Sequence, residues 1–64
     1  MGHYADAIEK YERSLALDPE DAETMSELGL AYLAVGRKDK CAELSIRLKK
    51  LDPGYGELLN RLSR

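Results

Sequence analysis

A set of residues recurs at a fixed offset of 34 positions along this 64-residue chain. The identical pairs are Gly2/Gly36, Glu9/Glu43, Arg13/Arg47, Leu17/Leu51, Asp18/Asp52 and Pro19/Pro53. These six identities fall within 18 consecutive positions, where average residue usage would give about one by chance. An internal period of this length is typical of stacked helical hairpins that cannot bury their apolar faces alone. The period therefore predicts a helical repeat fold.

Apolar residues follow helical spacing through most of the chain, which predicts about four helices. The predicted segments are a first helix that ends near Leu17, followed by helices over 22–35, 38–51 and 55–63. The first helix ends there because the residue before Pro19 is driven out of the α region. The second helix is apolar over more than one face, so we expect neighbours on both of its sides.

Turn residues separate these segments at the expected places. Asp21 is positioned to cap the second helix, and Gly36 suits the left-handed residue that ends it. Gly54 and Gly56 should weaken the start of the last helix, because glycine has low helix propensity. Cys41 falls on an apolar helix face and is therefore expected to be a packed core thiol.

Composition excludes several classes of function. The chain has ten basic and twelve acidic residues, interspersed, and a net charge of −2, so it offers no field for nucleic acid. Its longest stretch without charge or proline is nine residues, too short to insert into a membrane. With Cys41 and His3 each alone of their kind, we expect no catalytic residues, no metal site and no cofactor. The free cysteine and the absence of an apolar leader favour the cytoplasm.

The repeated positions resemble the tetratricopeptide repeat family, whose unit is a helix–turn–helix of 34 residues. The residues that carry the resemblance are Met25, Leu28, Gly29, Tyr32, Gly36, Cys41, Ser45, Leu48 and Pro53, preceded by Gly2, Ala7, Tyr11, Ser14 and Pro19 and followed by Leu59 and Leu62. Met25 replaces the usual tryptophan, Lys38 replaces an aromatic residue, and Leu48 replaces a smaller one. The resemblance implies an all-α fold of antiparallel helical hairpins, stacked as a right-handed α-solenoid.

The phase of the repeat implies how the single domain, residues 1–64, is divided. Residues 2–19 would be the second helix of a half repeat, 22–53 a nearly complete repeat, and 54–64 a C-terminal solvating helix. The first helix would then expose a partly bare apolar edge made of Tyr4, Ile8, Tyr11 and Leu15. We expect either that further repeats of a longer chain cover this edge, or that the chain pairs with itself, for example as a homodimer.

The resemblance also implies a partner-binding face, because the first helix of each repeat lines the concave groove in this family. The residues carried over to this face are Glu23, Ser26, Glu27, Leu30, Leu33 and Ala34. Two leucines beside two glutamates would suit a partner peptide or helix that carries apolar and basic groups. The alternative is that Leu30 and Leu33 only pack on neighbouring helices. We therefore expect a non-enzymatic protein-interaction module or scaffold, with structural self-assembly through the open helix faces as the alternative.

Overall fold

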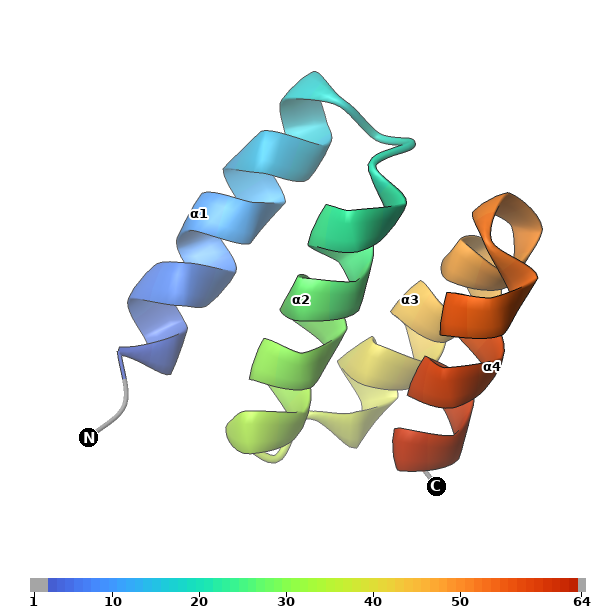
Figure 1. Ribbon diagram of the computed structural model, residues 1–64. Coiled ribbons are helices and arrows are strands. Elements are labelled where there is room, and N and C mark those ends of the chain that lie inside the picture. The colour runs from blue at the N-terminus through green and yellow to red at the C-terminus, as the bar shows by residue number, and fades with distance from the viewer. Residues whose placement is uncertain (1–2, 64) are drawn as a thin grey trace.

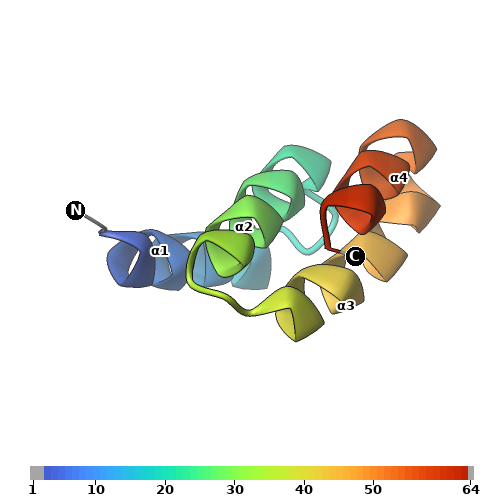
Figure 2. The ribbon, with the colours of Figure 1, turned by 90° about the horizontal axis from the view of Figure 1, so that it is seen from below.

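The computed structural model describes residues 3–63, which form a stack of α-helices joined by short turns (Figure 1). The helices are α1 (Tyr4–Leu17), α2 (Ala22–Ala34), α3 (Lys38–Leu51) and α4 (Pro53–Leu62). They lie in two layers, with α1 and α3 in one and α2 and α4 in the other (Figure 2). The all-α, hairpin-repeat prediction is therefore confirmed. Gly2 and Arg64, which belong to the predicted terminal segments, lie outside the described residues.

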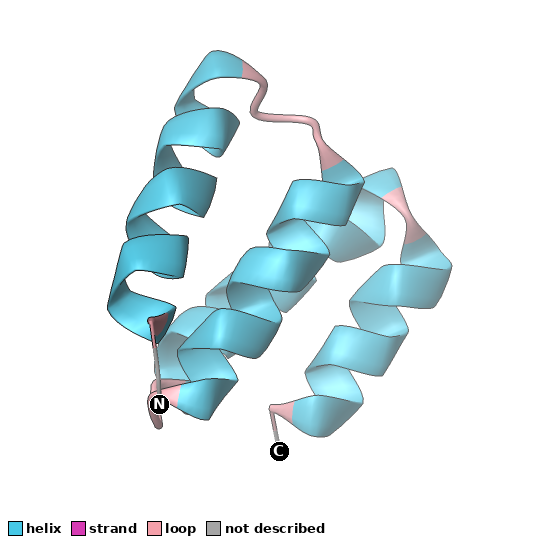
Figure 3. Ribbon diagram, turned by 60° about the vertical axis from the view of Figure 1, so that its left-hand side comes forward, coloured by secondary structure: helices cyan, strands magenta, loops and turns pink. Residues whose placement is uncertain are grey.

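Helix α2 is the centre of the stack, because it packs against α1, α3 and α4. This explains why its sequence is apolar over more than one face. Helix α1, by contrast, packs on α2 alone among the described helices. The described chain is a flat slab with extents of 31 × 28 × 14 Å, seen as helices and short loops in Figure 3.

Both ends of α2 are closed as the sequence predicts. Asp21 accepts hydrogen bonds from the Thr24 amide at 3.2 Å and from the Thr24 hydroxyl at 2.7 Å, and the hydroxyl in particular lowers the pKa of Asp21 below its ordinary value. At the other end Gly36 has a φ of +79°, the left-handed conformation that glycine adopts without a steric penalty. The amide of Arg37 then donates to the Tyr32 carbonyl at 2.8 Å.

Helix α4 begins at Pro53, two residues before the predicted start at Tyr55. The reason is Asp52, whose side chain accepts from the Tyr55 amide at 3.2 Å, and whose own amide donates to the Leu48 carbonyl at 2.7 Å. Pro53 takes the first helical position, where its missing N–H costs nothing. Asp52 therefore ends α3 and caps α4 at the same time.

The core lies between α2, α3 and α4, with a contribution from α1. Its buried hydrophobic residues are Leu15, Met25, Leu28, Ala31, Cys41, Leu44, Leu48 and Leu59. Cys41 is fully buried, as predicted, and this burial raises the pKa of its thiol. Ser45 is also buried, and its hydroxyl is satisfied by donating to the Ala42 carbonyl at 2.7 Å.

Two glycines allow helices to approach more closely than any side chain would permit. A Cβ atom on Gly29 would lie 2.6 Å from Cδ2 of Leu59, and one on Gly56 would lie 2.5 Å from the backbone nitrogen of Lys49. Gly29 permits this close approach where α2 meets α4. Gly56 was expected only to weaken a helix, yet it is what lets the start of α4 lie against the backbone of α3.

Candidate protein-interaction surface

The six residues predicted to bind a partner all lie on α2, but they differ in accessibility. Glu23, Glu27 and Ala34 are exposed, and Leu30 is 47% exposed. Ser26 is half-buried, and Leu33 packs against the core cluster. Leu33 therefore stabilises the fold, whereas Leu30 presents an accessible apolar side chain beside the carboxylates of Glu23 and Glu27.

A groove of about 500 Å³ runs between α1 and α2 next to these residues. Its lining residues are Tyr4, Ala7, Tyr11, Glu27, Leu30, Ala31 and Ala34. The groove therefore brings together side chains from the predicted binding face and from the predicted apolar edge. The lining is apolar except for the carboxylate of Glu27 and the two tyrosine hydroxyls, a composition that suits a protein segment better than a charged small molecule.

The predicted apolar edge on α1 is less open than expected. Tyr4 is 49% exposed, but Ile8 and Tyr11 are partly buried against the core cluster. Leu15 is only 8% exposed and belongs to the core, so its assignment to an open edge is wrong. The reason is that α1 turns this side toward α2, where Leu15 joins the cluster that includes Leu28.

Two tyrosine–glutamate pairs connect α1 to α2 in opposite directions. Tyr32 of α2 donates its hydroxyl to Glu12 of α1 at 2.7 Å, and Tyr11 of α1 interacts with Glu27 of α2. Burial, followed by the carboxylate of Glu12, raises the pKa of Tyr32 to about 12. A hydrogen bond to Glu27 is the main reason that the pKa of Tyr11 is raised. Among the described helices, α1 contacts only α2. These two pairs add hydrogen bonds to the apolar packing that holds α1 on α2.

The sequence analysis missed both pairs. Each requires the register between α1 and α2, which helical spacing within one segment does not determine. The only sequence signal was that each helix carries a tyrosine and a glutamate that could pair with those of its neighbour.

A second hollow of about 660 Å³ lies between α1 and α3. It is lined by Glu12, Leu15, Ala16, Pro19, Leu28, Tyr32, Lys40, Glu43, Leu44 and Arg47. The lining contains two acidic and two basic side chains, so it favours neither a basic nor an acidic partner. Its apolar residues Leu15, Leu28 and Leu44 are already buried in the core.

The link between Tyr32 and Glu12 makes the stability of the stack sensitive to alkaline pH. Since the pKa of Tyr32 is about 12 in the fold and about 10 ordinarily, its contribution is fully present below pH 10 and is lost as the pH rises through 12. We expect a phenolate step near pH 12 in the ultraviolet absorbance that disappears in Tyr32→Phe. In Glu12→Gln the step should move down but stay above 10, because burial remains. A Tyr32 step at 10 in the unmodified chain would contradict this arrangement.

The comparison with protein families gives a match to a model described as a TPR repeat over residues 1–36, more than half of the chain. The chain belongs to the tetratricopeptide repeat family. It is 31% identical over 62 residues, or 97% of its length, to the TPR repeat-containing thioredoxin TTL4 of Arabidopsis thaliana. It is also 32% identical, over 92% of its length, to the Protein CTR9 homolog of the same plant. No solved structure matches the chain significantly.

This tetratricopeptide chain spans 9% and 6% of the length of those two relatives. Tetratricopeptide repeats are in general modules for protein–protein interaction rather than catalysis, and the helical hairpins described above have that architecture. Among residues 3–63, no helix is both long and apolar enough to cross a membrane. Within the same range, no group of His, Cys, Asp or Glu is arranged to hold a metal ion.

Proposed function

We propose that this tetratricopeptide chain binds a partner helix or peptide along the exposed face of α2, with the α1–α2 groove as the main contact. The observation that carries the proposal is Leu30, which is 47% exposed in a groove that also contains the carboxylate of Glu27. An accessible leucine in a concave, largely apolar site is the kind of residue that provides binding energy when a partner covers it.

The charge around the groove indicates the chemistry of the partner. Residues 1–37 contain eight acidic and three basic side chains. Glu23 and Glu27 are exposed on α2. A partner that places apolar side chains over Leu30 and Ala34 and a lysine or arginine near Glu27 would match both features. The proposed partner is therefore a basic amphipathic segment.

Selection from a randomised peptide library, followed by calorimetry on the selected peptides, tests this proposal. We expect selected peptides to combine apolar and basic residues, and Leu30→Asp to weaken their binding at least about tenfold, as loss of a contact worth 1.4 kcal/mol would do. Glu27→Lys should weaken binding similarly through charge repulsion. Selection of acidic peptides, or unchanged binding by Leu30→Asp, would refute the proposed site.

A matched control is needed because Glu27 also interacts with Tyr11. Tyr11→Phe removes the hydroxyl while keeping the ring and Glu27 in place. Binding should change by less than about threefold in this variant if Glu27 acts on the partner directly, since half of 1.4 kcal/mol corresponds to roughly that factor. Far-UV circular dichroism of all three variants should match the unmodified chain.

A second candidate function is self-assembly through open helix faces. The observation in its favour is that the two ends of the stack expose apolar side chains about half, Tyr4 on α1 and Tyr55, Leu58 and Leu62 on α4. Apolar groups gathered in this way on a helix mark an interaction surface more often than they remain in contact with water.

A further inference from the structure

The last helix presents an apolar face that no other described residue covers. Tyr55 and Leu58 are 51% exposed and Leu62 is 47% exposed, and these residues share one side of α4 by helical spacing. At the opposite end of the stack, the groove between α1 and α2 is lined by Ala7 and Tyr11, which are only partly buried.

The 34-residue repeat shows what would cover the face on α4. Leu62 and Leu58 correspond to Leu28 and Thr24 of α2, one period earlier. In the middle of the stack those counterparts are 3% and 9% exposed, and Leu28 belongs to the core cluster together with Leu44 of α3. The position that α3 holds beside α2 is therefore the position left open beside α4.

The same 34-residue correspondence shows what would cover the surface of α1. Ala7 and Tyr11 correspond to Cys41 and Ser45 of α3, which are 0% and 1% exposed. Those counterparts are buried because α2 packs on α3 and α4 packs behind them. Since α4 is the repeat counterpart of α2, and α1 that of α3, a contact between α4 and α1 would repeat the α2–α3 contact already present in the chain.

Within one molecule α1 and α4 lie at opposite ends and do not touch (Figure 1). We propose that two copies of this chain associate head to tail, with α4 of one copy packed on α1 and in the α1–α2 groove of the next. This arrangement specifies the self-assembly named above as the second candidate function and rests on it.

The distribution of charge favours a second copy as the occupant. Residues 1–37 hold eight acidic and three basic side chains, whereas residues 38–64 hold four acidic and seven basic ones. Head-to-tail contact brings the acidic half of one copy against the basic half of the next. Contact between two like ends would instead place charges of the same sign against each other, which repel. The two ends are thus complementary in charge as well as in the repeat position of their apolar residues.

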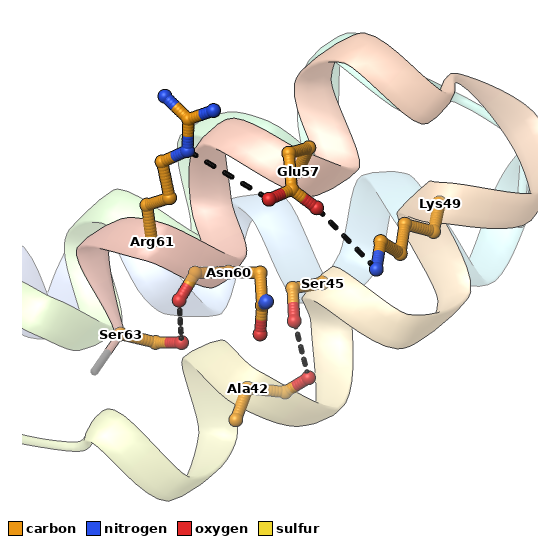
Figure 4. A network of polar contacts seen from close by, with 7 residues as sticks. All are labelled: Ala42, Ser45, Lys49, Glu57, Asn60, Arg61 and Ser63. Carbon is orange, nitrogen blue, oxygen red and sulfur yellow. Dashed lines mark hydrogen bonds and ion pairs between the residues drawn. The ribbon is translucent and has the colours of Figure 1, made fainter.

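The single acidic residue of α4 does not spoil this complementarity, because it is held by two cations (Figure 4). Lys49 Nζ lies 3.4 Å from Oε2 of Glu57, and Arg61 Nε lies 3.7 Å from Oε1 of the same carboxylate. The group formed by Lys49, Glu57 and Arg61 is therefore positive on balance, and the carboxylate of Glu57 is not left unpaired. A head-to-tail contact is also heterologous, so it leaves one free end on each outer copy and allows further growth.

The test uses two variants, one that blocks the apolar face of α4 and one that blocks the α1–α2 groove. Leu58→Asp places an acid on the exposed face of α4, and Ala7→Arg places a cation in the groove beside α1. Should Ala7→Arg fail to fold by circular dichroism, Tyr4→Arg closes the same groove from a residue that is 49% exposed. Ile46→Asp is the matched control, because Ile46 is 63% exposed on α3 and lines neither the α1–α2 groove nor the apolar side of α4.

Sedimentation equilibrium should show the unmodified chain and Ile46→Asp growing in mass with concentration, up to about 1 mM, the weak end of specific association. Each end variant alone should stay monomeric, while their mixture should form a one-to-one dimer and stop there, since only one intact α4 and one intact groove remain. A monomeric unmodified chain would overturn the proposal and leave the faces to another segment or protein. Self-association by either end variant alone would overturn it in favour of like-to-like contact.

Both proposals use the α1–α2 groove, so partner binding has to be tested in a variant that does not assemble. Leu58→Asp leaves Glu27 and Leu30 unchanged, so it should still bind peptides selected for the α2 face. A monomeric unmodified chain that binds peptides would reject the head-to-tail contact alone. If the unmodified chain assembles but monomeric Leu58→Asp selects no peptide, the binding site alone is rejected.

Discussion

Replacement of Leu48 by alanine is expected to lower the free energy of unfolding by about 2–5 kcal/mol. Leu48 is 0% exposed and belongs to the core cluster with Met25 and Leu59. The substitution removes the transfer free energy of the lost carbons and also leaves a cavity that the neighbouring helices fill only in part. Because the core of a chain this small rarely supplies more than about 3–5 kcal/mol in total, a substantial fraction of the variant should be unfolded without denaturant.

Leu17→Ala is the matched control for this substitution. It deletes the same atoms, but Leu17 is 90% exposed at the end of α1. Its effect should stay within about 0.5 kcal/mol, as is usual for surface positions. Chemical denaturation followed by circular dichroism measures both variants. Equal loss of stability in the two would mean that Leu48 does not occupy the buried position described here.

Gly56→Ala is expected to destabilise the chain by about 1–3 kcal/mol, although alanine is the better helix former. The added Cβ would lie 2.5 Å from both the nitrogen and the Cα of Lys49. These are backbone atoms, so relief requires α4 to move away from α3 as a whole. That movement would also loosen the contact of Leu59 with the core.

Gly54→Ala tests whether the effect comes from close approach or from glycine itself. Gly54 lies two residues earlier in the same helix, and the nearest atom to its added Cβ is Oδ1 of Asp52 at 3.4 Å. With that much space the helix propensity of alanine should dominate and stabilise the chain by up to about 1 kcal/mol. The two Gly→Ala variants are therefore expected to shift the melting temperature in opposite directions. Shifts of the same sign would contradict the close packing of α3 and α4.

Most of the secondary structure could be predicted from the sequence. Apolar spacing and the 34-residue period placed the helix over 38–51 as observed and ended the first helix at Leu17. Local turn chemistry correctly predicted the cap by Asp21 and the left-handed Gly36. These features succeed because each depends on residues within a few positions of one another.

The features that could not be predicted depend on contacts between helices. Whether Gly56 weakens a helix or permits close packing depends on how near Lys49 lies, which no local pattern contains. Leu15 was placed on an open edge because its spacing matches Tyr11, but the packing of α1 on α2 buries it. The pairing of Tyr32 with Glu12 likewise required the register between two helices.

The same dipeptide, Asp-Pro, forms two different junctions in this chain. After α1 it begins a loop of several residues, since α2 starts only at Ala22. After α3 there is no loop, because Asp52 donates to Leu48, accepts from Tyr55 with its side chain and accepts from Gly56 with its carbonyl. A residue inserted into the loop after Asp18 leaves the caps of both helices whole. A residue inserted at Asp52 would divide these bonds between two residues. The loop after Asp18 should therefore tolerate an insertion, whereas the junction at Asp52 should not.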